Sequence, residues 1–291
     1  MKGRAASSLL GAHMSIAGGY YKAVEEARRC GCDVVQLFTK NNTQWRAKPI
    51  TDDEARQFGS ALTELKIGSP ISHASYLINL ASPDEALRSK SIDGMAVELA
   101  RAEQLGIPFV IVHPGAHTTA TEEEGLALVS ASIDEIHCRL PQAKTEISLE
   151  LTAGQGSCLG WKLEQLAAII RNSKQPDKLR ICVDTCHAYA AGYDLRDRKG
   201  YLAFWRQFDE LLGLPRLVAI HLNDSKRELG SRVDRHEHIG RGQLGPEAFR
   251  QLLRDKRFRH VPMYIETAKG QENGESLDVI NLRTLRELAR A

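Results

Sequence analysis

Six short apolar segments of this 291-residue chain each carry one histidine or one acidic residue near the C-terminal end of the segment. A single histidine at such a place is usually a structural residue held by hydrogen bonds. A carboxylate among apolar neighbours, such as Glu150 in the stretch 148–151, is costly unless it is paired or binds a metal ion. Several carboxylates that converge would repel one another without cations. The six residues are His73, His113, Glu150, Asp184, His221 and Glu266.

Two further spacings add candidate metal ligands. His187 follows Asp184 by three residues across a strand end, so a turn can bring both side chains to one pocket. Asp234 and His236 are two residues apart, which puts both on one face of an extended segment. The resulting five imidazoles and four carboxylates form a set that zinc accepts and for which manganese competes. Because this set exceeds the needs of one ion, it suits a trinuclear site, in which metals about 3.5 to 4 Å apart can stabilise both oxygens of a phosphodiester displacement.

A repeated pattern supplies the elements that must position these residues: a short β-branched run, then an amphipathic helix. Strands that are apolar on both faces and alternate with helices indicate a parallel sheet covered by helices. Eight such units fit a closed (β/α)8 TIM barrel, a fold that typically takes about 250 residues and places its chemistry at the C-terminal ends of the strands. The expected strands are Leu9–Ser15, Val34–Phe38, Pro70–Ser75, Phe109–His113, Ile147–Thr152, Arg180–Thr185, Leu217–Leu222 and Met263–Thr267.

We therefore expect one α/β TIM-barrel domain over residues 1–291, with residues 1–8 as a flexible N-terminal extension and a trinuclear metal site at the C-terminal rim of the strands. Thr51 and Thr121, each followed three residues later by glutamate, predict helix starts, and so does Ser82 followed by proline. The segment Asp224–Gly245 is the least regular one, and a long loop in a compact fold is usually functional.

Composition excludes several classes of protein. A net charge of +2 gives no broad basic footprint, so a nucleic-acid role must depend on local sites. No apolar run approaches the roughly 20 residues that cross a bilayer, and the N-terminus lacks a secretory apolar region. We expect a cytoplasmic monomer with no membrane contact and no obligate protein partner. The six cysteines are expected to be reduced and mostly structural.

At these positions the sequence closely resembles the endonuclease IV family of apurinic/apyrimidinic (AP) site DNA repair enzymes. The matching stretches run from residue 11 to residue 266 in the family's order, and the candidate ligands coincide with the family's zinc ligands. A chance match of this extent is not credible. The stretches are Gly11–Gly19, Ser75–Leu80, His113–Gly115, Thr152–Ser157, Val183–His187, His221–Asp224 and Gly230–His236, together with Glu266.

The resemblance implies a base excision repair endonuclease that binds about three zinc ions per chain, with manganese as an alternative at one or more sites. The enzyme would hydrolyse the phosphodiester 5′ to an abasic site in double-stranded DNA, leaving a 3′-hydroxyl and a 5′-deoxyribose phosphate, and would also trim blocked 3′ ends. Glu150, Asp184 and Glu266 would be its catalytic residues. The ligand groups would be His73, His113 and Glu150; Glu150, Asp184, His221 and Glu266; and His187, Asp234 and His236.

The resemblance also implies DNA contacts. Tyr76 and Leu77 match the side chains that wedge into the DNA, and the alternative for both is core packing. Phosphate contacts, which give affinity without sequence preference, would come from the segment Asn41–Arg46 and the loop Arg232–Arg241. The alternative for both is a solvated loop. The residues expected to contact the DNA from these loops are Asn41, Trp45, Arg46, Arg232 and Arg235.

Two more histidines and three departures from the family pattern bear on the detail of the site. His13 and His117 are expected to hydrogen-bond the metal ligands without binding a metal ion themselves. Thr43 stands where many members carry an arginine that enters the DNA, Ala74 where an aspartate is common, and Leu151 where an asparagine is common. The departures concern DNA insertion and the hydrogen bonds around the ligands, and they leave the ligand set complete.

Two rival functions are compatible with a metal-binding barrel, because fold does not fix function. A sugar isomerase or epimerase would need about four ligands around one or two ions, so the additional His187, Asp234 and His236 argue against it. A catalytically silent protein that only recognises lesions would be expected to have lost at least one ligand.

Overall fold

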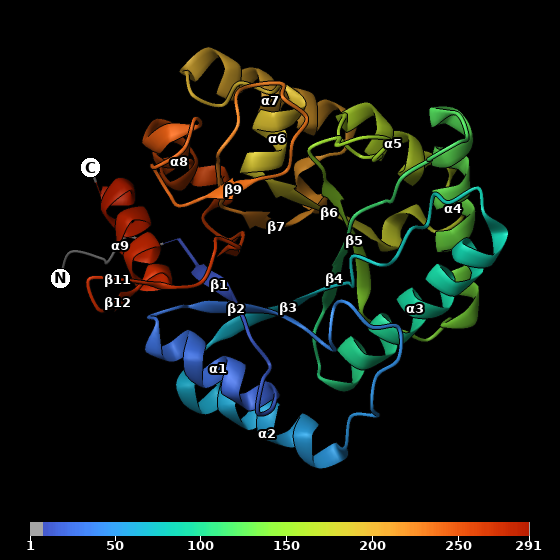
Figure 1. The fold of residues 1–291 in the computed structure, drawn as a ribbon, viewed down its shortest axis with the longest axis horizontal. Helices are drawn as coiled ribbons and strands as arrows, with labels where there is room; N and C mark the ends of the chain where they lie inside the picture. The colour runs from blue at the N-terminus through green and yellow to red at the C-terminus, as the bar shows by residue number, and fades with distance from the viewer. Residues whose placement is uncertain (1–7, 291) are drawn as a thin grey trace.

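Eight parallel strands form a closed barrel in the computed structural model of this chain, which describes residues 8–290 (Figure 1). The strands follow one another around the barrel in chain order, and the last, β10, pairs with the first. The predicted TIM barrel is therefore confirmed. The barrel strands are β1 (Leu10–Met14), β2 (Val34–Phe38), β3 (Gly68–His73), β4 (Phe109–Val112), β5 (Glu146–Leu151), β6 (Leu179–Asp184), β7 (Leu217–His221) and β10 (Met263–Ile265).

Helices surround the barrel on its outside (Figure 1). Thr51 and Thr121 cap α2 and α4 with reciprocal hydrogen bonds to Glu54 and Glu124, as predicted. The start predicted at Ser82 was wrong, because Asp84 caps α3 by accepting from the Leu87 amide. The helices are α1 (Tyr20–Arg29), α2 (Asp52–Leu65), α3 (Glu85–Gln104), α4 (Glu122–Arg139), α5 (Leu163–Asn172), α6 (Thr185–Ala191), α7 (Arg198–Leu211), α8 (Gly245–Arg254) and α9 (Leu277–Arg290), with short 3₁₀ turns η1 (Pro176–Lys178), η2 (Leu214–Arg216) and η3 (Lys256–Phe258).

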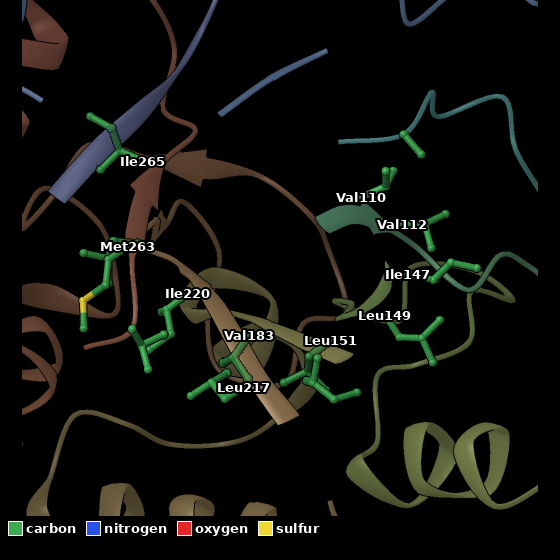
Figure 2. Packing of buried hydrophobic residues seen from close by; sticks show 14 of the residues in the cluster. Val110, Val112, Ile147, Leu149, Leu151, Val183, Leu217, Ile220, Met263 and Ile265 are labelled. Atoms are coloured by element: carbon green, nitrogen blue, oxygen red, sulfur yellow. The ribbon is translucent and has the colours of Figure 1, made fainter. Parts of the chain in front are cut away.

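Alternate residues of each strand point to opposite faces, and this alternation divides the core in two. The outward side chains form one hydrophobic cluster with buried residues of the helices. Figure 2 shows Val110 and Val112 of β4 and Ile147, Leu149 and Leu151 of β5 on the outer side of their strands. The inward side chains form a separate cluster inside the barrel. Its members are Val34, Ile71, Ile111, Cys182, Ala219 and Tyr264.

The inner cluster determines which residues reach the rim. On each strand the residue two positions later points inward again, one layer closer to the C-terminal end. These later residues, which we call the rim layer, are polar on every strand that contributes to the inner cluster. They are Gln36, His73, His113, Asp184, His221 and Glu266.

Connections beyond the barrel strands contain two small antiparallel pairs: β8 (Asp224–Ser225) with β9 (His236–Glu237), and β11 (Gln271–Glu272) with β12 (Glu275–Ser276). The irregular segment 224–245 is thus folded back on itself by the first pair.

Of the expected N-terminal extension, residues 1–7 lie outside the described residues. Ser8 is buried and its hydroxyl donates to the Leu253 carbonyl at 3.4 Å, and the flexibility of the extension stays a prediction. Within residues 8–290, no helix has the length and apolar character that a membrane crossing requires.

Candidate metal centre

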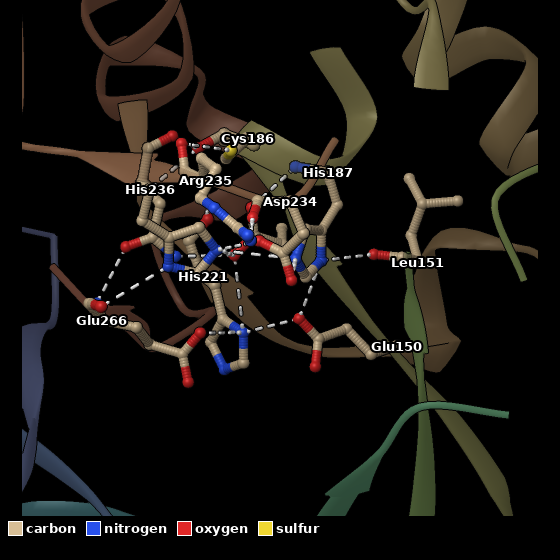
Figure 3. Close-up of polar contacts among 12 residues, drawn as sticks. Glu150, Leu151, Cys186, His187, His221, Asp234, Arg235, His236 and Glu266 are labelled. Carbon is tan, nitrogen blue, oxygen red and sulfur yellow. Dashed lines mark hydrogen bonds and ion pairs between the residues drawn. The ribbon is translucent and has the colours of Figure 1, made fainter. Parts of the chain in front are cut away.

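Glu150 on β5 belongs to the rim layer as well, since it follows the inward Ser148 by two residues, and it is completely buried. Its Oε2 lies 3.0 Å from His73 Nε2 and 3.2 Å from His113 Nε2. Its Oε1 lies 3.0 Å from His221 Nδ1 and 3.2 Å from His187 Nδ1, and Figure 3 shows these last two contacts. Burial opposes ionisation, but the imidazoles of His221 and His113 hold the pKa of Glu150 well below its usual range. One buried carboxylate therefore joins ligand-type side chains from four other segments of the chain.

A second group lies on the other side of Glu150. Ligand-type atoms of Glu150, Asp184, His221 and Glu266 all lie within 4.8 Å of one another. His221 Nδ1 is 3.2 Å from Glu266 Oε2 and 3.8 Å from Asp184 Oδ2. Burial raises the pKa of Glu266, but His221 outweighs this effect and the pKa falls to about 2. Glu266 is therefore ionised at neutral pH.

A third group is built outside the barrel strands. Asp184 ends β6 and caps α6 by accepting from the His187 amide at 2.9 Å, which places His187 directly above the rim. The pairing of β8 with β9 brings Asp234 and His236 to the same place. Asp234 lies 3.2 Å from His187 Nε2 and 3.3 Å from His236 Nε2. The spacing arguments for these residues thus correspond to a helix start and a short β-pair.

Asp224 anchors the segment that carries Asp234 and His236. Its buried carboxylate accepts from the backbone amides of Gly242 at 3.1 Å, Leu244 at 3.0 Å and Gly245 at 3.3 Å. A Cβ at Gly242 would overlap the Ser225 carbonyl, so the close approach requires glycine there. The segment is therefore a folded loop tied at its base.

Backbone carbonyls hold the outer nitrogens of three histidines. His73 Nδ1 donates to Ala74 O at 2.7 Å and His187 Nδ1 donates to Leu151 O at 3.0 Å. His236 Nδ1 lies 3.4 Å from Glu266 O. These bonds leave each Nε2 facing the cluster. Because Ala74 and Leu151 act through their carbonyls, their departures from the family pattern leave these hydrogen bonds intact.

The residues present fit divalent metal ions. Three groups of three or four ligand-type atoms within 4.8 Å of one another contain all nine candidates (His73, His113 and Glu150; Glu150, Asp184, His221 and Glu266; His187, Asp234 and His236). Mixed imidazole and carboxylate donors suit zinc, and buried converging carboxylates are stabilised by cations. Cys186 also lies near Asp184 and His236. Burial raises the pKa of its thiol to about 12, so the thiol is protonated in the metal-free chain, and its Sγ donates to the Arg235 carbonyl at 3.7 Å.

Sequence reasoning missed two buried amides that support the cluster. Gln36 contacts both His221 and Glu266. Asn223 donates to Asp184 Oδ2 at 2.6 Å and accepts from the Glu266 amide at 2.8 Å. Gln36 could have been found as the one polar residue in an otherwise apolar strand, and Asn223 as part of the matching stretch after His221.

The two supporting histidines differ in their surroundings. His13 Nδ1 lies 3.9 Å from Glu266 and accepts from the Gln36 amide at 3.0 Å. Burial lowers the pKa of His13 to about 3, so its ring is neutral. His117 Nδ1 instead donates to the Ala120 carbonyl at 2.6 Å, and among residues 8–290 its recorded hydrogen bonds involve none of the candidate ligands. His117 therefore supports a loop rather than the cluster.

Tyr76 stands at the open face of the cluster. Its side chain is 59% exposed, and it lines one pocket with His113, His187, Asp234, His236 and Glu266. Leu77 is half-buried beside it. Core packing, the alternative for Tyr76, does not describe this exposed position.

The segment 41–46 lies next to this face and is held by helix α3. Ser75 Oγ donates to Asn42 O at 2.6 Å, and the buried Glu98 accepts from the Ser75 amide at 3.2 Å. Glu98 also pairs with Lys40 at 3.2 Å. Helix α3 thus joins the loop after β2 to the loop that carries Tyr76.

The expected DNA-contacting side chains of these loops are not equally available. Asn41 is exposed, but its Oδ1 accepts from Thr43 N and Oγ1, so this side chain forms a local turn. Trp45 is half-buried against Gly94 of α3, whereas Arg46 is exposed. Arg232 donates to Gly154 O and stacks on Trp161, and Arg235 is exposed with its guanidinium bonded to Asp234 O.

Fold and site together define a class: a TIM barrel with groups of side chains at its C-terminal rim that could hold metal ions. A family described as xylose isomerase-like TIM barrel matches residues 24–288. A probable endonuclease 4 of Trichlorobacter lovleyi is 48% identical over 97% of this chain and 100% of that protein, and one of Chloroflexus aurantiacus (strain J-10-fl) is 49% identical over 96% and 98%. The crystal structure of endonuclease IV from Thermus thermophilus superposes with a TM-score of 0.85 at 34% identity, covering 97% of this chain and 98% of that chain.

This chain belongs to the endonuclease IV family. A D-tagatose 3-epimerase-like protein also superposes, with a TM-score of 0.72 at 17% identity over 96% of this chain and 97% of that chain. At that identity the likeness concerns the barrel fold alone.

Proposed function

We propose that this chain is a zinc-dependent DNA repair endonuclease that hydrolyses the phosphodiester 5′ to an abasic site in double-stranded DNA and also trims blocked 3′ ends. One observation carries the proposal: all nine ligand-type residues of the family pattern converge at one rim, beneath an exposed tyrosine. Membership of the endonuclease IV family supports the same substrate class. The products would be a 3′-hydroxyl and a 5′-deoxyribose phosphate.

Three groups of residues would hold the metal ions, with Glu150 shared between the first and the second. When bound, zinc would supply Lewis-acid catalysis, because it activates water near neutral pH and offsets the charge on a phosphodiester. Without cations, the carboxylates of Asp234 and Glu266 at the open face would repel a DNA phosphate. The groups are His73, His113 and Glu150; Glu150, Asp184, His221 and Glu266; and His187, Asp234 and His236.

Differences in burial indicate how the chain would present this site to DNA. Glu150, Asp184 and His221 are completely buried, so they would hold their geometry while DNA binds. The side chains of His113 and Asp234 are 29% and 39% exposed and face the pocket, so a phosphate could approach them. Tyr76, which lines the same pocket, would fill the space left by the missing base.

The phosphate contacts would come from exposed cations near this face. Arg46 and Arg235 are exposed and would contact the backbone directly. Arg232 is held by Gly154 and Trp161, so we assign it a supporting role for its loop. A cytoplasmic location and a monomeric state stay predictions.

The test is incision of a duplex oligonucleotide that contains one abasic-site analogue. We expect the zinc-loaded chain to cut 5′ to the analogue and leave a 3′-hydroxyl. Glu266→Gln and chelated protein should be inactive, whereas Tyr264→Phe, a buried change on the same strand, should remain active. A fully loaded chain that leaves this substrate intact would overturn the proposal, and turnover of a ketose would then favour the epimerase alternative.

The third ligand group argues against both alternatives. A sugar isomerase has no evident use for His187, Asp234 and His236 in addition to a complete two-ion set. A protein that only recognises lesions would not need Asp234 held 3.2 Å from His187 and 3.3 Å from His236.

A further inference from the structure

Gln36 on β2 occupies a place in the rim layer where the other strands present ligand-type side chains. It is completely buried, and its neighbours along the strand are apolar. A buried amide costs stability unless its donors and acceptor are bonded. The rim residues of the other seven strands are His13, His73, His113, Glu150, Asp184, His221 and Glu266.

The contacts of Gln36 fix the orientation of its amide. The Nε2 group donates to Glu266 Oε1 and, at 3.0 Å, to His13 Nδ1. The Oε1 atom lies 2.7 Å from His221 Nε2. A flipped amide would place its oxygen against the Glu266 carboxylate, which carries no proton to donate. Both hydrogens and the oxygen of the amide are therefore used.

This orientation selects one tautomer of His221. Because an amide oxygen only accepts hydrogen bonds, His221 Nε2 must carry the proton and donate it. Nδ1 then faces Glu150 at 3.0 Å and Glu266 at 3.2 Å, and in the zinc-loaded chain it would be the nitrogen that gives up its proton to bind the ion. His73, His187 and His236 show the opposite arrangement, since backbone carbonyls bind their Nδ1 atoms and leave Nε2 for the cluster.

We propose that Gln36 is a positioning residue for one metal ion, because it selects the Nδ1-ligating form of His221 and aims Glu266 at the same ion. This inference rests on the proposed function for the presence of zinc, but not on the DNA substrate. Outer hydrogen-bond partners of metal ligands typically contribute about 10- to 100-fold in metal affinity. His221 depends on a side chain for this bond, so a substitution can remove it.

The first test needs no variant. In the zinc-loaded wild-type protein, nitrogen-detected NMR of labelled histidines should show His221 protonated at Nε2 and metal-bound at Nδ1. The reverse assignment would overturn the proposal directly. This measurement decides the matter even if a substituted chain fails to fold.

The second test compares Gln36→Met with Tyr264→Phe. Methionine matches glutamine in length and removes all three hydrogen bonds, whereas the control removes one buried bond, from Tyr264 Oη to Ser69 O at 2.6 Å, inside the same barrel. In competition with a chelating dye, Gln36→Met should release one zinc ion at about 10- to 100-fold lower chelator concentration than wild type. The control should release zinc as wild type does.

Equal zinc retention by Gln36→Met and wild type would overturn the proposal. Zinc loss to the same extent in Tyr264→Phe would also overturn it, because the effect would then reflect a loosened barrel. Since neither readout uses DNA, failure to incise abasic DNA would contradict the proposed function and leave this inference standing.

Discussion

Replacing Asp224 by asparagine should loosen the loop that carries the third ligand group while leaving the barrel intact. The carboxylate accepts from four backbone amides: Ser225 at 2.8 Å, Gly242 at 3.1 Å, Leu244 at 3.0 Å and Gly245 at 3.3 Å. In either orientation an asparagine amide would turn its NH2 group toward some of these donors. With the NH2 group in place of Oδ2, the Gly242 amide loses its acceptor while Gly245 keeps Oδ1; with it in place of Oδ1, the Ser225 and Leu244 amides lose theirs. At least one N–H group is therefore left without an acceptor.

The magnitude follows from this count. Each unsatisfied buried donor costs about 1–3 kcal/mol. Burial also raises the pKa of Asp224, so the charge itself is held at a cost and part of the loss is offset. We expect a net effect of about 1–2 kcal/mol on loop closure, which corresponds to roughly a 5- to 30-fold larger open population.

Native-state hydrogen exchange measures this opening directly. The amides of Gly242 and Leu244 should exchange roughly 5- to 30-fold faster in Asp224→Asn, with barrel amides such as that of Leu149 unchanged. Asp209→Asn is the matched control, because Asp209 accepts from the Leu214 amide on an exposed surface. Unchanged exchange at Gly242 and Leu244 would refute the anchoring role of Asp224.

Four more outcomes follow from the structure. Burial lowers the pKa of His236, but Asp184 outweighs this effect and raises the pKa to about 9. Zinc binding at pH 7–8 should therefore release protons, so the calorimetric heat of binding should change with the ionisation enthalpy of the buffer. Equal heats in different buffers would contradict this. For the same reason, the stability that protonated His236 gives the metal-free protein is present below about pH 6.5 and lost as the pH rises through about 9, which should lower the melting temperature. Glu98→Gln would leave the buried Lys40 without its ionic partner and should lower the free energy of unfolding by about 3 kcal/mol, as measured with denaturant. A change below about 0.5 kcal/mol would show that Glu98 of α3 does not stabilise the loop after β2. Tyr76→Ala should change stability by less than about 0.5 kcal/mol because the ring is exposed, yet raise KM for abasic DNA; an unchanged KM would exclude the wedge.

Alternation along the strands explains why the rim could be predicted from the sequence. Inward residues such as Ile71 and Tyr264 fix the parity of their strands, so His73 and Glu266 must point into the barrel as well. The same logic identified the barrel, since buried parallel strands are apolar on both faces.

Long-range hydrogen bonds explain what the sequence did not reveal. Gln36 and His221 are 185 residues apart, and nothing in the local pattern of either strand indicates that they meet. The start of α3 was misplaced because Ser82 and Asp84 are both good caps, and the choice between them depends on how the preceding loop packs. His117 has the residue type of a ligand support, but a local carbonyl binds its ring.

Restoration of activity to the metal-free chain by measured additions of zinc tests the central claim most directly. Incision 5′ to an abasic site should appear as zinc is added and reach its plateau at about three equivalents per chain, as a polynuclear site requires. A plateau at one equivalent, or incision that persists in the metal-free chain, would contradict the assignment of the nine candidate ligands to a trinuclear centre.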